Sequence, residues 1–458
     1  MQYQLRISGK HHNILWKHLF PGDGKEAVAI GLCGHHSNKE LHIMLVHEVF
    51  CIPHSNCERS PNYVHWQTDS IIHLLEKAAK KKFTIVKFHS HPTGYSQFSE
   101  LDNESDRKLF PSVFGWIDGD HPHASAVMLP NAKLFGRVYT TSGVFHTLQK
   151  ISVVGDSISI WNKKDSIIDE EISKRNIQTF GLGTSKLLKG MKIGVVGASG
   201  TGSPTIEQLS RLGVGELVIV DAKLVEKKNL NRILNTYKEH SIERKYKVDV
   251  LSESIVKIGF DTKVKVFKKN LYESKKAILE LISCDFIFGC VDSIDGRHLL
   301  NQISTFYLVP YIDIGVKLEA DKSGGINQVN GAVHYIQPGG SSLMSRGVYS
   351  AEGLESASLM RQDPEEFERR AKEKYIVNMP VESPAVISIN MQVSSFAVNE
   401  FLDRIHPFKG TDQSERAIHW INISEDIIFS ESDGLSDDFL EQRVGRGDTT
   451  PFLQMPEL

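Results

Sequence analysis

Two histidines and an aspartate in the first third of the chain have the spacing of a metal site. His89 and His91 lie two residues apart in FTIVKFHSHP, a segment typical of a β-strand, so their side chains are predicted to point to the same face. After a turn at residues 92–94, the run FSELD brings Asp102 as a third ligand. Three protein ligands leave one position open for water, which is the pattern of a catalytic zinc site.

Glu26 and Ser99 are the groups that could act beside this metal. A catalytic zinc lowers the pKa of water to about 7 and polarises the scissile carbonyl, while a free carboxylate carries the proton. Glu26, far upstream, is the candidate general base, and Ser99 belongs to the same FSELD run as Asp102. We therefore expect hydrolytic chemistry in this part of the chain.

The remaining histidine pairs and the cysteines give no second metal site. His11 and His12 form one pair and His35 and His36 another, but no carboxylate follows either pair at ligand spacing. We expect these four histidines to lie in solvated loops. The five cysteines contain no CxxC pair, which argues against both a cysteine zinc site and a disulfide framework.

A glycine-rich turn near residue 200 predicts a nucleotide site. KIGVVGASGTGSPTIEQL reads as a strand, a turn and a helix, so backbone N–H groups at the helix start could hold phosphates. Gly197, Gly200 and Gly202 let the backbone approach a ligand closely. Asp221, at the end of the strand ELVIVD, is placed to accept hydrogen bonds from ribose hydroxyls. These features alone fit an NAD-dependent dehydrogenase as well as an ATP-binding enzyme.

The zinc pattern resembles a known motif. Glu26, HSHP, Ser99 and Asp102 together are similar to the JAMM motif of the MPN/JAB metalloprotease family, which includes deubiquitinating isopeptidases. The resemblance extends from the strand KEAVAIGLCG to roughly residue 140. It implies that the two histidines and the aspartate bind zinc, that Glu26 is the base and that Ser99 supports the oxyanion. The alternative is an MPN scaffold without metal, but such relatives usually lack a ligand and none is missing here.

Three segments of the second part resemble the ThiF/MoeB/HesA family, relatives of the ubiquitin-activating enzymes. They are RNIQTFG, the stretch KNLNRI, which is similar to S-N-L-x-R, and CVDSIDGRHLLN; the resemblance covers about residues 170–410. It implies that Asn229 and Arg232 contact phosphates and that Asp292 holds magnesium. It also implies that Lys247, in RKYKVDV, stabilises charge on the reacting phosphate.

Such a set of charges favours ATP over NAD. Adenylation needs cations and Mg²⁺ near the α-phosphate, because negative charge builds there while a carboxylate displaces pyrophosphate. Lys245 is the alternative to Lys247, since this loop is two residues longer than the usual spacing. Arg175 is, by resemblance, a residue that can reach across a dimer. For Arg297 and Asn301, helix capping and packing explain the residues as well as a direct role does.

The sequence departs from this family in its cysteines. After Gln337 and Pro338 the family often carries a CxxC zinc pair and then a reactive cysteine that takes the acyl group as a thioester. Here the stretch reads PGGSSLMSRGVYS, with Ser342 and Ser345 where the pair would stand, and all cysteines lie at or before Cys290. We expect neither a structural zinc nor a thioester on this chain, and we expect Cys284 and Cys290 to be inert core thiols.

The elements that must position these residues predict two α/β domains. Residues 26–53 contain two apolar runs around HHSNKE, typical of a strand pair with a turn, and IIHLLEKAAKKK predicts a helix. Beyond the charged NKKDSIIDEEISKR, short strands alternate with helices as in a doubly wound parallel sheet. The predicted order is an MPN/JAB-like metalloprotease domain (1–160), a linker (161–174), a Rossmann-like ThiF adenylyltransferase domain (175–430) and an acidic to polar, loosely ordered tail (431–458).

Composition and charge exclude several classes of protein. The 458 residues include 53 basic and 56 acidic side chains, and a net charge of -3 gives no field that calls for nucleic acid or a membrane surface. The first residues, MQYQLRISGKHH, contain no apolar signal-peptide core, and we find no run of about eighteen apolar residues. We therefore expect a cytoplasmic protein without nucleic-acid or membrane partners.

The two sites together suggest one pathway. The zinc peptidase would trim or deconjugate the C-terminus of a ubiquitin-like protein, and the second domain would adenylate such a carboxylate with ATP and Mg²⁺. The expected partners are a ubiquitin-like protein or peptide, a separate acyl acceptor or conjugating protein, and a second copy in a homodimer. Two alternatives remain: adenylation of a peptide or small-molecule carboxylate in a biosynthetic or sulfur-transfer pathway, and a scaffold that binds a ubiquitin-like protein without turnover.

Overall fold

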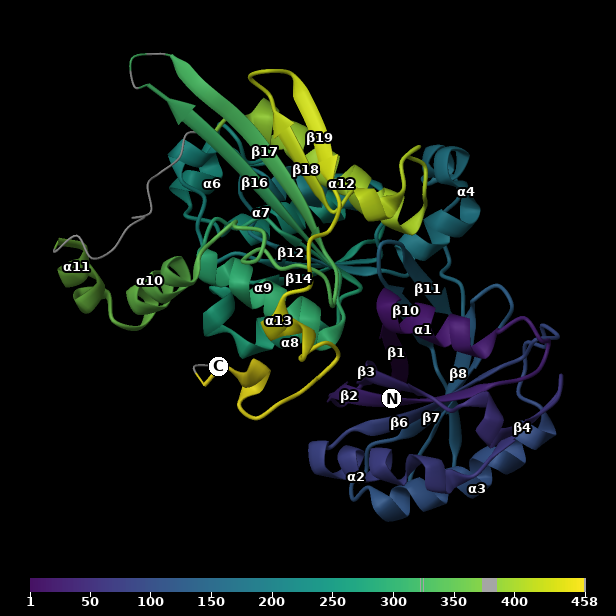
Figure 1. Ribbon diagram of the computed structural model, residues 1–458. Coiled ribbons are helices and arrows are strands. Elements are labelled where there is room, and N and C mark those ends of the chain that lie inside the picture. The colour runs from purple at the N-terminus through teal and green to yellow at the C-terminus, as the bar shows by residue number, and fades with distance from the viewer. Residues whose placement is uncertain (322, 324, 373–384, 457–458) are drawn as a thin grey trace. The chain divides into compact units, whose positions relative to one another are not determined.

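The chain folds as two units, each around its own β-sheet (Figure 1). The computed structural model describes residues 1–321, 323, 325–372 and 385–456. The first unit comprises residues 1–164, residues 305–308 and residues 442–456 of the C-terminal segment. The second unit comprises residues 165–304 and the described residues of 309–441.

A nine-stranded mixed sheet forms the centre of the first unit. Its strands lie in the order β11 (Ile158–Asn162), β10 (Lys150–Val154), β1 (Gln2–Ser8), β3 (Leu41–Cys51), β2 (Val28–Ser37), β6 (Thr84–Ser90), β7 (His123–Met128), β8 (Leu134–Tyr139) and β9 (Phe145–Thr147). Strand β1 runs parallel to β3 and β10, and β6 runs parallel to β7, whereas the other pairs are antiparallel.

Helices cover both faces of this sheet, because its strands carry buried side chains on both sides. Helix α1 (Gly9–Leu19) contributes Leu15 and Leu19 to the core of one face. Helices α2 (Ile72–Lys81) and α3 (Glu100–Trp116) contribute Leu75 and Val113 to the core of the other. Between β3 and α2 lie the short elements η1 (His54–Asn56), β4 (Cys57–Arg59), β5 (Val64–Trp66) and η2 (Thr68–Ile71).

The prediction of solvated loop histidines is wrong for both pairs. His11 and His12 lie in α1, where the His12 ring bonds the Ala132 carbonyl at 3.0 Å and burial lowers the pKa of His11 to about 4. His35 and His36 belong to strand β2, so the turn between β2 and β3 is shorter than HHSNKE. The sequence could not predict the surroundings of His36, because its carboxylate partner, Asp448, lies 412 residues further along the chain.

The C-terminal segment is also more ordered than predicted. Residues 442–456 pack in the first unit, where Val444, Phe452 and Leu453 are buried. The Asp448 amide donates a hydrogen bond to the His35 carbonyl at 2.9 Å. The segment contains the 3-10 turn η6 (Phe452–Gln454) and follows the short helix α13 (Asp438–Glu441). The polar composition of this segment predicted disorder, but a few buried apolar residues hold it in place.

An eight-stranded sheet forms the second unit, and its first half is the predicted doubly wound sheet. The order is β14 (Lys263–Phe267), β13 (Glu216–Val220), β12 (Lys192–Val196), β15 (Phe286–Gly289), β16 (Tyr311–Ala320), β17 (Ile326–Ile336), β18 (Ile418–Asn422) and β19 (Ile427–Glu431). Strands β14 to β16 in this order are all parallel, which confirms the predicted fold class. Strands β17, β18 and β19 continue the sheet in antiparallel fashion, which the sequence analysis did not predict.

Helices and turns connect these strands. They are α4 (Lys174–Lys189), α5 (Gly202–Arg211), η3 (Lys227–Asn229), α6 (Lys238–Ile242), α7 (Lys247–Ile258), η4 (Leu271–Glu273), α8 (Lys275–Ile282), α9 (Ile294–Tyr307), α10 (Ala351–Gln362), α11 (Pro364–Lys372), α12 (Ile387–Ile405) and η5 (Gln413–Glu415). Helix α12 packs against α5 and against β16 and β17. In the described ranges, no helix has the length and apolar character needed to cross a membrane.

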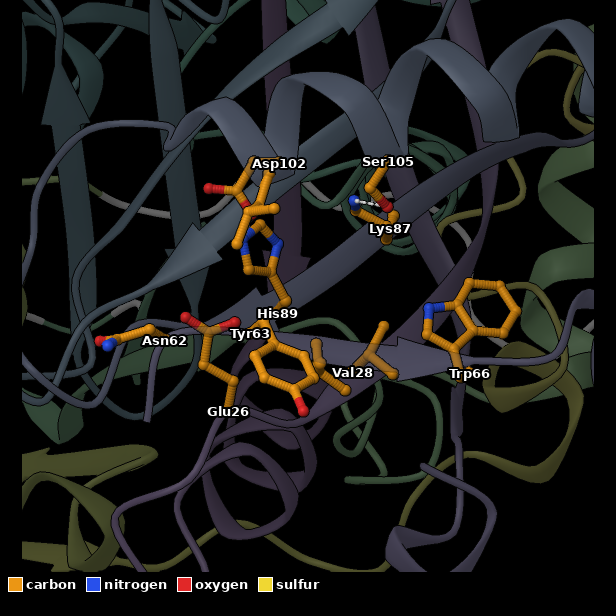
Figure 2. A pocket seen from close by; sticks show the side chains of 11 residues that line it. Glu26, Val28, Asn62, Tyr63, Trp66, Lys87, His89, Asp102 and Ser105 are labelled. Atoms are coloured by element: carbon orange, nitrogen blue, oxygen red, sulfur yellow. Dashed lines mark hydrogen bonds and ion pairs between the residues drawn. The ribbon is translucent and has the colours of Figure 1, made fainter. Parts of the chain in front are cut away.

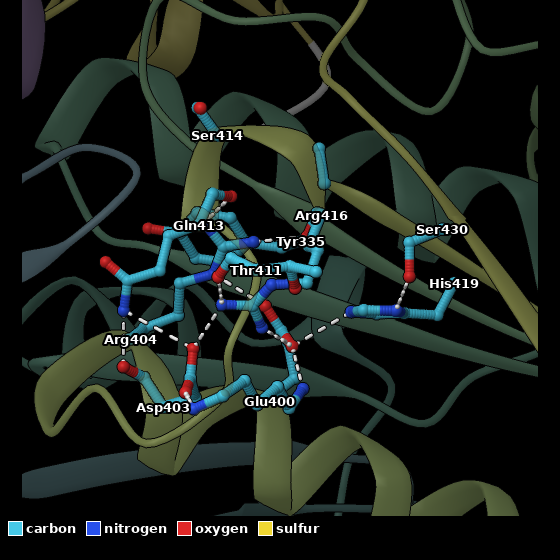
Figure 3. Close-up of polar contacts among 12 residues, drawn as sticks. Tyr335, Glu400, Asp403, Arg404, Thr411, Gln413, Ser414, Arg416, His419 and Ser430 are labelled. Atoms are coloured by element: carbon cyan, nitrogen blue, oxygen red, sulfur yellow. Dashed lines mark hydrogen bonds and ion pairs between the residues drawn. The ribbon is translucent and has the colours of Figure 1, made fainter.

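A buried network of charged groups fixes α12 to strand β18 (Figure 3). Glu400 of α12 pairs with Arg404 at 2.8 Å and with His419 of β18 at 2.9 Å. Asp403 pairs with Arg416 at 2.6 Å. Burial opposes the charge on Glu400, but His419 and Arg404 outweigh it and lower the pKa of the carboxyl group. The network therefore sets the position of α12, whose first turn lies beside the glycine-rich turn of the second unit.

Candidate metal centre and nucleotide site

The three predicted zinc ligands converge in the first unit. His89 Nε2 lies 2.9 Å from Asp102 Oδ1, and His91 Nε2 lies 3.3 Å from Asp102 Oδ2. The two Nε2 atoms are 3.2 Å apart. All three residues are buried, and they form the one group in the described part of the chain whose geometry suits a metal ion.

Strand β6 and helix α3 hold these ligands in place. Strand β6 carries His89 and ends at Ser90, and the His91 amide then donates to the Met128 carbonyl at 3.0 Å. Ser99 caps α3 by accepting the Asp102 amide, while its own hydroxyl donates to Asp102 Oδ2 at 2.7 Å. In this arrangement Ser99 orients a ligand, and its oxyanion role stays a prediction.

The donor set fits a cation such as zinc. His91 Nδ1 lies 2.7 Å from the Tyr95 carbonyl, which can only accept, so this nitrogen carries the hydrogen. In the neutral ring, Nε2 then directs a lone pair toward the Asp102 carboxylate and His89. Lone pairs that face one another need a positive charge between them, and a hydrogen-bonded second ring nitrogen is usual for zinc-bound histidine. Burial lowers the pKa of His91, but the contact with Asp102 outweighs it and raises that pKa overall.

Glu26 lines the same pocket as His89 and Asp102 (Figure 2). The side chain is 5% exposed. Burial, followed by the charge of Asp102, raises the pKa of Glu26 to about 7, although His91 and Lys87 oppose the shift. A carboxyl group whose pKa lies near neutrality is suited to take up and release a proton during catalysis.

The predicted nucleotide site lies at the point where the strand order of the second sheet reverses. The glycine-rich turn follows β12, which lies between β13 and β15, and ligands bind at such switch points in open α/β sheets. Gly197 has a φ of 93°, and a Cβ atom there would collide with the Cys290 carbonyl. A Cβ atom at Gly202 would collide with the Gly197 carbonyl. The turn is therefore closed to any other residue at these two positions.

Asp221 directly follows β13 and contacts this turn. Its Oδ2 accepts a hydrogen bond from the Ala198 amide at 2.8 Å, and its Oδ1 accepts one from Lys223 at 2.8 Å. A carboxylate oxygen can accept more than one hydrogen bond, so both retain capacity for ribose hydroxyls. The structure brings Asp221 and the glycine turn together as the spacing predicted.

Lys247 and Arg232 place positive charge beside Asp221 and the turn. Lys247 is 4% exposed; burial lowers its pKa, and the Asp221 carboxylate opposes that shift. Arg232 Cδ lies 3.5 Å from the point where a Cβ of Gly200 would stand. Asn229 is buried and accepts a hydrogen bond from the Glu226 amide at 3.1 Å. Lys245, the alternative, pairs with Glu243 and Glu253 instead.

The other predicted residues of this unit lie in three different surroundings. Asp292 is exposed after β15, next to the start of α9. Arg297 pairs with the buried Asp313 at 3.1 Å, and the Asn301 amide group donates to the Arg297 carbonyl, which are packing contacts. Arg175 lies in α4 and bonds Gln178.

Asn390 is a candidate site residue that sequence reasoning missed. It lies in the first turn of α12, is 4% exposed, and has no hydrogen-bond partner for Nδ2 among the described residues. The Nδ2 atom and Arg232 border the same side of Gly200. No motif marks an asparagine at the start of a helix 190 residues downstream, so only the packing of α12 on α5 reveals it.

The serines in place of the CxxC pair form a hydrogen-bonded corner. Ser345 Oγ accepts the Ser342 amide at 2.9 Å, and Ser342 Oγ donates to Asp437 Oδ2 at 2.6 Å. Arg346 pairs with Asp433 at 2.9 Å nearby. These contacts join the segment after β17 to the segment after β19.

Relatives of known name match parts of this chain. Ubiquitin-like modifier-activating enzyme 5 of Drosophila willistoni is 26% identical over 183 residues, which is 37% of this chain and 42% of that protein. The protein of the same name from Culex quinquefasciatus is 28% identical over 158 residues, or 32% of this chain and 37% of that protein. The chain thus spans less than half the length of these relatives.

Two solved structures match part of this chain at low similarity. E. coli MccB with ATP covers 59% of this chain and 73% of its own, with 15% identity and a TM-score of 0.44. Microcin C7 biosynthetic enzyme MccB in complex with N-formylated MccA gives 18% identity and a TM-score of 0.46, over 58% of this chain and 73% of its own.

Two family matches divide the chain. Residues 8–135 match the family described as prokaryotic homologs of the JAB domain. Residues 173–427, more than half of the chain, match the ThiF family. Both matches agree with the resemblances drawn from the zinc pattern and from the segments RNIQTFG, KNLNRI and CVDSIDGRHLLN. The chain belongs to the ThiF family and carries a JAB-type domain in front of its ThiF region.

Proposed function

We propose that this protein is a bifunctional enzyme that processes and activates the C-terminus of a ubiquitin-like protein. Its first unit would be a zinc-dependent peptidase or isopeptidase, and its second unit would adenylate a C-terminal carboxylate with ATP and Mg²⁺. The observation that carries the first activity is the convergence of His89, His91 and Asp102 on one point beside the buried Glu26. A homodimer in the cytoplasm completes the proposal.

The peptidase role rests on what each side chain can do. A zinc ion held by His89, His91 and Asp102 would polarise the scissile carbonyl and activate water. Glu26 takes a proton from the attacking water and returns it to the leaving nitrogen, for which a pKa near 7 is suitable. Ser99 keeps Asp102 in its ligand orientation through the 2.7 Å hydrogen bond.

The adenylation role rests on the charges around the glycine-rich turn. The turn and the α5 start would bind phosphates, Asp221 the ribose, and Asp292 the magnesium ion. Asn229, Arg232 and Lys247 would stabilise the charge that builds on the α-phosphate. A carboxylate oxygen attacks the α-phosphorus, the bond to the β-phosphate oxygen breaks, and pyrophosphate leaves. The names of the curated relatives support a ubiquitin-like protein as the source of that carboxylate.

Two assays on the full chain test the proposal. ATP–pyrophosphate exchange should depend on Mg²⁺ and on a ubiquitin-like protein that ends in glycine, and it should be lost in Asp292→Ala. Exchange driven by a free amino acid or short peptide instead would favour the biosynthetic alternative. The zinc-loaded protein should also cleave a modifier precursor, and chelation should stop cleavage while exchange continues. Absence of both activities, with neither zinc nor ATP bound, would favour a scaffold.

A further inference from the structure

Lys87 places a buried cation in the pocket of the metal centre. It lies on β6 two residues before His89, so both side chains point to the same face of the sheet. It lines the pocket together with Glu26, His89 and Asp102. In Figure 2, Lys87 and Ser105 lie on the opposite side of His89 from Glu26. The part of a substrate that extended past His89, away from Glu26, would approach Lys87.

Lys87 shares its ion-pair partner with a second cation. Its ammonium group pairs with Asp106, whose side chain is fully buried. The same carboxylate also pairs with Arg137 at 2.7 Å, so one negative charge serves two positive ones. Arg137 is further held by Asn103 and by the rings of Phe98 and Phe145. Among the three charged side chains one positive charge remains, and it lies on the side of His89 that faces away from Glu26.

Lys87 also has spare hydrogen-bonding capacity. An ammonium group carries three donors. In the described part of the chain, the polar partners of Lys87 are Asp106 and, at a long 3.4 Å, Ser105 Oγ. A buried cation with an unused donor is stabilised most by an anionic acceptor, because a charge-assisted hydrogen bond is about twice as strong as a neutral one. A carboxylate is the anionic acceptor that a peptide substrate can offer.

We propose that Lys87 binds the terminal carboxylate of the fragment that the peptidase releases, an inference that rests on the function proposed above. Residues two apart on a strand are separated by about 7 Å, and an extended peptide advances about 3.5 Å per residue. The released fragment is therefore one or two residues long. The substrate class is a precursor with a short C-terminal extension.

The reaction with such a precursor is a simple hydrolysis. The oxygen of water bonds to the carbonyl carbon before the extension, and the C–N bond breaks. The leaving nitrogen takes up a proton through Glu26, and the fragment keeps its own carboxylate, which stays paired with Lys87 until release. An isopeptide conjugate offers no such carboxylate, because its leaving group is a lysine side chain within a folded protein. The pocket thus favours trimming of precursors over deconjugation.

Paired peptides test this subsite on the zinc-loaded full chain. The probes are a synthetic peptide ending in Gly-Gly-Ala with a free carboxylate and the same peptide with a C-terminal amide, and cleavage is followed by mass spectrometry. We expect kcat/KM of the wild-type protein to be at least about tenfold higher for the acid, as a charge-assisted contact implies. In Lys87→Met this ratio should fall toward one, whereas Lys87→Arg should keep a preference for the acid.

Lys77→Met is the matched control, because Lys77 is an exposed lysine of α2 that pairs with Glu48 outside the pocket. It should keep the wild-type ratio. Equal cleavage of the acid and the amide by the wild-type protein would contradict the carboxylate subsite but not the proposed peptidase activity. This comparison uses only the wild-type protein, so it does not depend on the folding of a variant. An unchanged acid-to-amide ratio of kcat/KM in Lys87→Met, at wild-type zinc content, would also contradict the subsite. Failure of the zinc-loaded wild type to cleave either peptide would overturn the proposed peptidase and this inference with it.

Discussion

His36 Nδ1 lies 3.0 Å from Asp448 Oδ1, although 412 residues separate the two in the chain. The Tyr307 hydroxyl donates to the same oxygen at 2.8 Å. Asp448→Ala should therefore destabilise the first unit by about 1–2 kcal/mol, a modest value because the carboxylate is 38% exposed. The change in the free energy of unfolding is measured by urea denaturation, and hydrogen exchange of the β2 amides shows whether the loss lies in the first unit. Asp118→Ala, at an exposed position of the same unit, is the control and should change little.

The contribution of Asp448 should also depend on pH. Burial raises the pKa of Asp448, but the hydrogen bonds from His36 and Tyr307 outweigh it, so the folded pKa is below the usual 3.8. A carboxyl group whose pKa is depressed by folding stabilises the protein above its unfolded pKa, and this stabilisation disappears as the pH falls through the folded pKa. The difference between wild type and Asp448→Asn should thus be constant from pH 7 to about 5 and shrink below about 4. A difference that grew on acidification would contradict this.

Variants of the metal centre should distinguish the residues that bind zinc from the residue that acts as the general base. His89→Ala and Asp102→Ala remove atoms that lie within bonding range of one point, so both should lose zinc and peptide cleavage. Glu26→Ala should keep zinc and lose at least about a hundredfold in cleavage rate, as removal of a general base does. Zinc is measured by mass spectrometry of the purified protein. Loss of zinc from Glu26→Ala would show that Glu26 is a ligand.

The two lysines of RKYKVDV should behave differently. Lys247 is buried beside Asp221, whereas Lys245 forms ion pairs with Glu243 and Glu253. Lys247→Ala should slow ATP–pyrophosphate exchange by about a hundredfold or more, in line with the loss of one charge-stabilising donor. Lys245→Ala should change the rate by less than about threefold, as expected for exposed ion pairs. The reverse order would assign the catalytic role to Lys245.

Asn390 should contribute to binding of the ATP phosphates and not to binding of the nucleoside. Its unpaired, buried amide nitrogen borders Gly200 next to Arg232, where a phosphate oxygen could accept a hydrogen bond. Asn390→Ala should weaken ATP binding about tenfold and leave adenosine binding unchanged, as measured by calorimetry. Asn399→Ala, an exposed asparagine of the same helix, is the control. Equal weakening of ATP and adenosine would point to a displaced helix.

No thioester should form on this chain. Cys284 and Cys290 are buried, and burial raises the pKa of Cys290 to about 12, which suppresses the reactive thiolate. Incubation with ATP and a ubiquitin-like protein should therefore give a bound acyl-adenylate and no thiol-sensitive band on a non-reducing gel. A band that disappears in Cys290→Ser would show that this cysteine is the acceptor, and transfer to a separate partner would have to be abandoned.

Local spacing determined most of what the sequence could predict. The alternation of side chains along a strand predicted that His89 and His91 lie together; β6 ends at Ser90, but His91 directly after it still points toward His89 and Asp102. Asp102 falls in the first turn of a capped helix. The glycine turn and Asp221 likewise follow neighbouring parallel strands, whose carboxyl ends meet at one edge of the sheet. Periodicity and short-range motifs carry this information, so it can be read without a structure.

Contacts between distant segments were decided only by the tertiary structure. Asp448 meets His36 because buried apolar residues anchor the C-terminal segment on the first unit, and no local pattern couples residues so far apart. Asn390 reaches Gly200 because the buried charges of Glu400 and Asp403 fix α12. No sequence motif distinguishes Lys87 from other strand residues. Only the structure shows that its partner Asp106 also pairs with Arg137. The charge balance of a buried site depends on every side chain that packs around it, and those neighbours are set by the fold.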